Sequence, residues 1–138
     1  MSDGFVIDAS IGLAWVHPSQ ATPESDALLA DVESGARVMV PAIWFAETAN
    51  ALLVLERRKK LTRGERAKAL SRLGDLNILP DEDGHRFVFS SVSEVASKQG
   101  LSVYDASYLE LAVRRGLPFA SRDEAVKAAA EKCGLVVR

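Results

Sequence analysis

Short apolar runs alternate along the chain with longer segments in which apolar residues recur every three or four positions. The short runs occupy residues 5–7, 38–40, 78–80, 118–120 and 135–137. They are continuously apolar, which is typical of parallel strands buried on both faces. The longer segments predict helices between successive strands. This alternation predicts an α/β fold, a three-layer α/β/α sandwich with a short parallel sheet, formed by one domain over residues 1–138.

One predicted helix, over residues 41–60, is apolar on nearly every side until its basic end. A helix of this kind normally lies in the interior, so we expect it to be central. Pro41 suits its first position because the fixed φ of proline is favourable there. The helix carries Glu47, about two turns from that start, and Asn50 on the same face. The next expected helices begin at the capping box of Thr62 and near residues 81–83.

The stretch from Ser102 to Asp123 contains a helix and the strand that follows it. Ser102 and Asp105 have the spacing of a helix start, and Gly116 ends the helix after roughly 18–20 Å. The chain then turns back along a strand of similar length. Two elements of equal length that run in opposite directions should bring Asp105 and Asp123 to the same edge of the sheet.

The composition is that of an ordinary globular protein, with 48% hydrophobic and 26% charged residues. The start of the chain lacks a basic region followed by a long apolar run, and no apolar segment is long enough to cross a membrane. We therefore expect a cytoplasmic protein with no membrane association. The single cysteine, Cys133, excludes an internal disulfide and agrees with a reducing compartment.

The net charge of −2 conceals a strong segregation. Residues 57–72 contain eight basic residues and one acid, so this segment carries +7 and the remainder −9. Two interpretations remain open: the cations stabilise the end of a helix through its dipole, or they contact phosphates. If the patch binds RNA, the contacts that we expect are Arg57, Arg58, Lys59 and Lys60.

A third acid, Asp8, follows the first strand, and ligands of parallel α/β sheets bind beyond the carboxyl ends of the strands. Taken singly, each acid has a structural interpretation. Asp8, Asp105 and Asp123 suit helix starts. Glu47 could be half-exposed and bonded to Asn50, and spacing alone does not bring it to this edge.

Taken together, the acids favour a metal site. Two carboxylates about 4 Å apart repel by roughly 4 kcal/mol at an effective dielectric constant near 20. Such a cluster persists when protons or cations neutralise it. Oxygen donors without a nearby His or Cys favour Mg²⁺ or Mn²⁺ over zinc. Ser10 and Ser121 add hydroxyls close by, and Asn50 could orient Glu47 or a bound water.

Four motifs follow one another along almost the whole chain. They are VIDAS around Asp8, Glu47-x2-Asn50 after Pro41, Tyr104-Asp105-Ala106-x-Tyr108, and Ala120-Ser121-Arg122-Asp123. In these motifs the chain resembles PIN-domain ribonucleases, and specifically the VapC toxins of bacterial and archaeal toxin–antitoxin pairs. The resemblance implies that the catalytic, metal-binding acids are Asp8, Glu47, Asp105 and Asp123. It also implies that Glu47 points into the site. Ser121 stands where the family more often has Thr, which preserves the hydroxyl.

The function that this resemblance implies is an endoribonuclease dependent on Mg²⁺ or Mn²⁺, with tRNA, rRNA or mRNA as substrate. Metal-assisted hydrolysis would leave a 5′-phosphate and a 3′-hydroxyl. A cognate antitoxin protein and a homodimer are the implied partners. Two alternatives are a PIN nuclease of RNA processing and a non-catalytic RNA-binding or protein-interaction module of the same fold. The non-catalytic module would normally have lost one or more acids, and all four are present.

Overall fold

The computed structural model describes residues 4–138. In this part of the chain, four parallel strands form one sheet in the order β3-β2-β1-β4. The strands are β1 (Gly4–Ile7), β2 (Arg37–Val40), β3 (Ile78–Pro80) and β4 (Phe119–Ala120). The last expected strand, over residues 135–137, contributes only a single parallel bridge between Val137 and Phe119. The predicted parallel sheet is confirmed.

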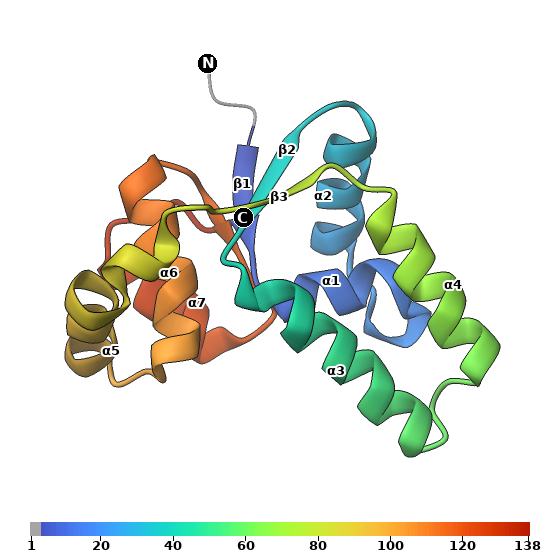
Figure 1. Ribbon diagram of the computed structural model, residues 1–138. Coiled ribbons are helices and arrows are strands. Elements are labelled where there is room, and N and C mark those ends of the chain that lie inside the picture. Colours follow the sequence, from blue (N-terminus) through green and yellow to red (C-terminus); the bar gives the residue numbers. More distant parts are fainter. Residues whose placement is uncertain (1–3) are drawn as a thin grey trace.

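Helices cover both faces of this sheet. They are α1 (Ala9–Val16), η1 (Pro18–Gln20), α2 (Pro23–Glu33), α3 (Ile43–Arg57), α4 (Arg63–Gly74), η2 (Gly84–Phe87), η3 (Val88–Val92), α5 (Ser93–Gln99), α6 (Val103–Arg115) and α7 (Glu124–Lys132). Figure 1 shows α5, α6 and α7 on one side of the strands and α1 to α4 on the other, which is the predicted three-layer arrangement. None of the helices formed by residues 4–138 is long and apolar enough to cross a membrane.

The core lies at the sheet, as continuously apolar strands require. The side chains of β1 and β4 illustrate this, since Val6, Ile7 and Phe119 are completely buried. The local start and stop signals also hold. Thr62 and Glu65 form a reciprocal capping box at the start of α4. Gly116 adopts φ +66° after α6, a left-handed conformation that glycine reaches without the steric cost of a Cβ atom.

Helix α3 is not central, contrary to the expectation from its apolar composition. Its buried side chains are Trp44, Thr48 and Leu52, a single stripe with a spacing of four residues. Phe45, on another side of the helix, is 42% exposed. The reason is that α3 and α4 form a hairpin that extends away from the sheet, as Figure 1 shows, so that only one side of α3 finds a partner.

The start of α3 packs closely against α1. A Cβ atom added to Gly12 would lie 2.8 Å from Cζ2 of Trp44, so only glycine allows this approach. The indole Nε1 of Trp44 in turn donates a hydrogen bond of 3.1 Å to the backbone oxygen of Asp8. The close packing of Gly12 and Trp44 therefore helps to hold the first acid of the motifs in its place.

We predict that Gly12→Ala lowers the free energy of unfolding by about 1–3 kcal/mol, because overpacking forces the indole or α1 to shift. Urea denaturation measures this change. Gly74→Ala is the matched control, because a Cβ atom there meets nothing within 4 Å. An equal effect of the two substitutions would contradict the proposed packing role of Gly12.

Candidate active site

The pairing of β1 with β4 brings the first and last motifs together. Ile7 lies opposite Ala120 in the parallel register, so the next residues along the two strands, Asp8 and Ser121, are neighbours at the same sheet edge. The hydroxyl of Ser121 donates a hydrogen bond to Oδ2 of Asp8. Residues 113 positions apart in sequence are thereby joined directly.

Asp8 is buried and serves as the N-cap of α1. Its Oδ1 accepts hydrogen bonds from the backbone nitrogen of Ser10, at 3.1 Å, and from the Ser10 hydroxyl. Burial raises the pKa of the Asp8 carboxyl, although the hydrogen bonds from Ser10 and Ser121 act in the opposite direction. The structural interpretation of Asp8 as a helix cap is therefore correct, and the cap also presents a partly desolvated carboxylate at the sheet edge.

Glu47 reaches the same region through Tyr108. Helix α3 begins at Ile43 rather than at Pro41, so Glu47 lies little more than one turn from its start. The phenol of Tyr108, on α6, donates a hydrogen bond to Oε1 of Glu47. Burial, this hydrogen bond and the nearby negative charges raise the pKa of Tyr108 far above its usual value. Tyr108 therefore remains a neutral donor that fixes Glu47.

Asp105 and Asp123 are close enough to affect each other. Burial, together with the charge of Asp123, raises the pKa of Asp105. Asp123 caps α7, since its Oδ1 accepts hydrogen bonds from the backbone nitrogens of Ala125, at 2.9 Å, and Val126, at 3.3 Å. The prediction that Asp123 suits a helix start is therefore confirmed. This repulsion between Asp105 and Asp123 agrees with the prediction that the two carboxylates lie at the same edge of the sheet.

The two serines of the motifs connect the loops that carry the acids. The hydroxyl of Ser121 accepts a hydrogen bond of 2.9 Å from the backbone nitrogen of Asp123 while it donates to Asp8. The hydroxyl of Ser10 accepts one of 2.8 Å from the backbone nitrogen of Arg122. Both serines therefore hold the loop after β4 against the loop after β1.

The expected contact between Asn50 and Glu47 does not form in the described part of the chain. The side chain of Asn50 is instead exposed. The partner of Glu47 is Tyr108, which belongs to one of the sequence motifs but had no predicted role. The sequence did not predict this hydrogen bond because the two residues are 61 positions apart.

The charges of Glu47, Asp8 and Asp105 all act on Tyr108, and the charge of Asp123 acts on Asp105. Among residues 4–138, no three Asp, Glu, His or Cys side chains converge closely enough to hold one ion. The donor set nevertheless suits Mg²⁺ or Mn²⁺, because it consists of carboxylate and hydroxyl oxygens. Mg²⁺ in particular keeps several waters and commonly uses only one or two carboxylates together with substrate phosphates. Burial raises the pKa of Asp8, and burial together with the charge of Asp123 raises that of Asp105, so a cation would stabilise both ionised carboxylates.

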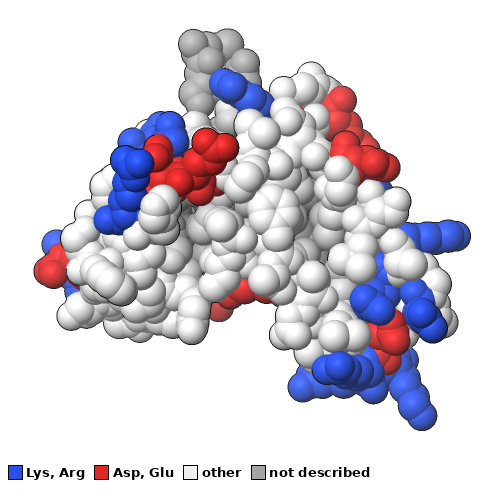
Figure 2. Space-filling model, viewed as in Figure 1, with Lys and Arg blue, Asp and Glu red and all other residues white. Residues whose placement is uncertain are grey.

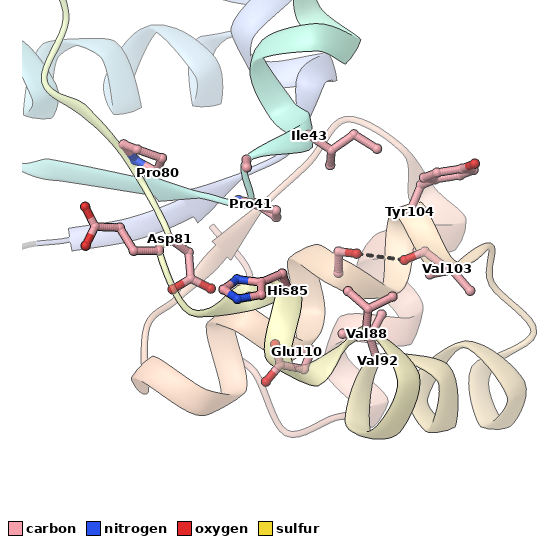
Figure 3. A pocket seen from close by; sticks show the side chains of 14 residues that line it. Pro41, Ile43, Pro80, Asp81, His85, Val88, Val92, Val103, Tyr104 and Glu110 are labelled. Atoms are coloured by element: carbon pink, nitrogen blue, oxygen red, sulfur yellow. Dashed lines mark hydrogen bonds between the residues drawn. The ribbon is translucent and has the colours of Figure 1, made fainter.

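A large apolar cavity of about 580 Å³ lies next to this site. Figure 3 shows that it opens between the starts of α3 and α6 on one side and η2 and η3 on the other. Val103 and Tyr104, which directly precede Asp105, line its wall and are 40% and 59% exposed. The cavity therefore presents apolar surface to solvent beside the acids.

Behind this cavity, a buried ion-pair network that the sequence did not reveal holds α6 against the end of β3. The Arg114 guanidinium binds Asp81 and also Glu110, at 2.9 Å. It also lies 4.5 Å from the centre of the Phe87 ring. Burial alone would raise the pKa of Asp81, but the hydrogen bonds and charge of Arg114 lower it. Asp81 was expected to begin a helix. It is instead buried and paired with Arg114 of α6, a contact that the acidic residues around it in the sequence could not predict.

The comparisons with known proteins agree with this arrangement. The family model described as the PIN domain matches residues 5–132. This chain belongs to the PIN domain family. Membership in this family supports a nuclease function for the chain. No match was found among curated proteins.

Several solved structures have the same fold. PAE2754 from Pyrobaculum aerophilum is 24% identical, with a TM-score of 0.69 over 99% of this chain and 92% of that one. VapBC2 from Rickettsia felis, bound to a DNA fragment from its promoter, is 12% identical, with a TM-score of 0.65 over 98% and 97% of the two chains. FitAcB from Neisseria gonorrhoeae is 21% identical, with a TM-score of 0.60 over 96% and 95%. At these identities the likeness establishes the fold.

We predict that Asp105→Asn raises the free energy of unfolding in EDTA at pH 7. The pKa of Asp105 is raised on folding, so its ionised form destabilises the native state above that pKa. The gain should shrink as the pH falls through the raised pKa, because the native carboxyl is then protonated. Urea denaturation across this pH range measures the effect.

The control for this prediction is Asp75→Asn, an exposed acid at the end of α4. A gain from Asp105→Asn that did not change with pH, or that the control reproduced, would contradict repulsion as its cause.

Proposed function

We propose that this PIN domain is a metal-dependent endoribonuclease and the toxin of a toxin–antitoxin pair, with residues 1–138 as its single domain. One observation carries the proposal. Ser121, at the end of β4, donates a hydrogen bond to Asp8 at the end of β1, Tyr108 donates one to Glu47, and the charge of Asp123 acts on Asp105, which supports a common site for the four acids. The relatedness of the fold to VapBC-5 of Mycobacterium tuberculosis, a member of a toxin–antitoxin family, supports the biological role.

The proposed metal ligands and catalytic residues are Asp8, Glu47, Asp105 and Asp123. A divalent ion, when bound, supplies the acidity that makes water a nucleophile near neutral pH and the charge that stabilises the leaving oxygen. Ser10 and Ser121 hold the Asp8 carboxylate in one orientation, and Tyr108 does the same for Glu47. These hydrogen bonds reduce the rearrangement that the acids would otherwise undergo when they bind the ion and the phosphate.

Hydrolysis at this site would leave a 5′-phosphate and a 3′-hydroxyl. Neither histidine of the chain, His17 or His85, belongs to the acid motifs. A mechanism in which histidines activate the 2′-hydroxyl of the substrate is therefore not expected. The substrate class that we propose is tRNA, rRNA or mRNA.

The proposed protein partners are a cognate antitoxin and a second copy of this chain, in the cytoplasm. The apolar surface formed by Val103 and Tyr104 lies immediately before Asp105, so a partner segment on it would reach the acids. VapBC-5 of Mycobacterium tuberculosis belongs to the VapBC family of toxin–antitoxin systems, which agrees with a protein partner.

We predict that Asp8→Asn, Asp105→Asn and Asp123→Asn each lower the rate of RNA cleavage by about 100-fold or more, because each removes a charged oxygen donor at the metal. Gel assays on tRNA and rRNA with Mg²⁺ or Mn²⁺ measure the rate, and EDTA should abolish it. Asp75→Asn, which is remote from the site, should cleave like the wild type.

Two outcomes would contradict the proposed reaction. Cleavage that survives EDTA would exclude a role for divalent ions. Loss of cutting after a 2′-deoxy substitution at the cleaved nucleotide would indicate attack by the 2′-hydroxyl instead of water. Unfolding of all three Asn variants would instead support structural roles for the acids.

We also predict that neutralising Arg57, Arg58, Lys59 and Lys60 weakens RNA binding and its dependence on salt concentration. Figure 2 shows basic side chains gathered at the end of the α3–α4 hairpin, where phosphates could approach. The slope of log K against log salt should decrease by about 0.7 for every phosphate of single-stranded RNA that the variant no longer neutralises. Fluorescence anisotropy in EDTA measures both quantities, and unchanged binding at every salt concentration would identify the patch as merely solvated.

A further inference from the structure

A second cavity, of about 440 Å³, lies between the end of α1, η1 and the side of α4, and it extends to the turn that joins α3 to α4. Lys60, Lys68 and Arg72 line it, together with the His17 ring. The apolar part of its wall includes Leu61 and Ala69, both buried. We call this cavity the hairpin pocket. It is distinct from the acid cluster and from the apolar cavity beside α6.

The charges in the hairpin pocket favour an anion. Within residues 4–138, Lys60, Lys68 and Arg72 form no ion pair with an acid. The neighbouring Arg66 differs, because Glu56 holds it at 2.5 Å. The one acid of the lining is Glu65, which accepts a hydrogen bond of 2.8 Å from the backbone nitrogen of Thr62. Three cations thus face one acid that already has a partner.

The chain leads from the hairpin pocket to the acid cluster through a series of polar interactions. Nε2 of His17 lies 2.8 Å from the hydroxyl of Ser19, also in the lining. The next residue, Gln20, accepts a hydrogen bond of 2.6 Å from the guanidinium of Arg122. Arg122 lies between Ser121 and Asp123, within the loop of the proposed active site. Arg122 is thus connected, through Gln20, to the segment of His17 and Ser19 that lines the pocket.

The two places are separated by about the length of one helix. Asp8 caps the start of α1 and His17 caps its end, and eight helical residues span about 12 Å. A nucleic-acid strand with one phosphate at the acids could therefore place another phosphate in the hairpin pocket.

The turn that presents Lys60 is conformationally costly. Lys59 has φ +61°, and it is the only residue other than glycine with a positive φ in residues 4–138. This left-handed conformation disfavours a side chain with a Cβ atom, and glycine would adopt it more easily. Leu61, which is 8% exposed, anchors the turn next to Lys60. Such strain is often found where a segment has a functional role.

We propose that the hairpin pocket binds a backbone phosphate of the RNA substrate, away from the phosphate that is cleaved. This inference rests on the proposed function, because it takes RNA as the ligand. The lining favours phosphate over a base, since its described residues include three cations and the hydroxyl of Ser19, whereas the one aromatic ring, that of His17, already contacts Ser19. The pocket would fix the register of the strand on the enzyme.

The first test removes two cations of the pocket. Lys68→Gln/Arg72→Gln should weaken binding of a single-stranded RNA oligonucleotide about tenfold in EDTA, because the variant cannot form charge-assisted hydrogen bonds to phosphate. The slope of log K against log salt should fall by about 0.7 for every phosphate that the pocket no longer neutralises. Both residues are exposed, so the urea midpoint should not change. Fluorescence anisotropy measures binding.

The matched control is Lys98→Gln/Lys132→Gln, which removes the same charge from exposed positions on α5 and α7. It should change the affinity by less than about threefold, because these positions are remote from the pocket. Equal effects of the two double variants, or no effect of Lys68→Gln/Arg72→Gln, would overturn the proposal. Binding is measured without metal, so its outcome is separate from that of the cleavage assays.

A second test uses the two histidines of the wild-type chain, produced without a histidine tag. His17 lines the hairpin pocket, whereas His85 lines the apolar cavity. In proton NMR spectra, RNA should shift the imidazole signals of His17 and leave those of His85 in place. The shift should be absent in Lys68→Gln/Arg72→Gln. A shift confined to His85 would overturn the assignment of the pocket.

Discussion

The parallel pairing of β1 with β4 is the constraint on which the candidate site depends. Strand β4 contains only two residues, and it pairs Phe119 with Val6 and Ala120 with Ile7. Because the register is fixed by completely buried side chains, a slip would expose part of the core. The polar residues that follow the two strands must then meet, and Ser121 donates to Asp8 at that point.

Local hydrogen bonds make this crowded edge compatible with a folded chain. Asp8 and Asp123 both cap helices, so backbone N–H groups partly compensate their negative charge. Glu47 is held by a neutral phenol, since the pKa of Tyr108 is far above its usual value. Asp105 has less compensation, and its pKa is raised by burial and by Asp123. The negative charge that remains is what a divalent cation would neutralise.

The charges that are segregated along the sequence also lie in different parts of the folded molecule. Asp8 and Asp123 come after β1 and β4, whereas the cations of residues 57–72 lie on a hairpin that extends from the sheet, as Figures 1 and 2 show. Helix α6 carries Asp105. It is held in place by the hydrogen bond of Tyr108 near its middle and by the ion pairs of Arg114 near its end. For the proposed RNA substrate, this separation would let the basic hairpin attract the strand while the acids act at one phosphate.

The sequence alone determined the order of strands and helices, the helix caps at Thr62 and Ser102, and the meeting of Asp105 with Asp123. These features depend on residues close together in the chain or on the lengths of adjacent elements. Tertiary contacts decided the rest. Trp44 packs on Gly12 and bonds to Asp8, which holds the start of α3 against α1, and Glu47 meets Tyr108 of α6. The burial of Asp81 by Arg114 likewise joins residues 33 positions apart, because packing between distant segments leaves no periodic trace in the sequence.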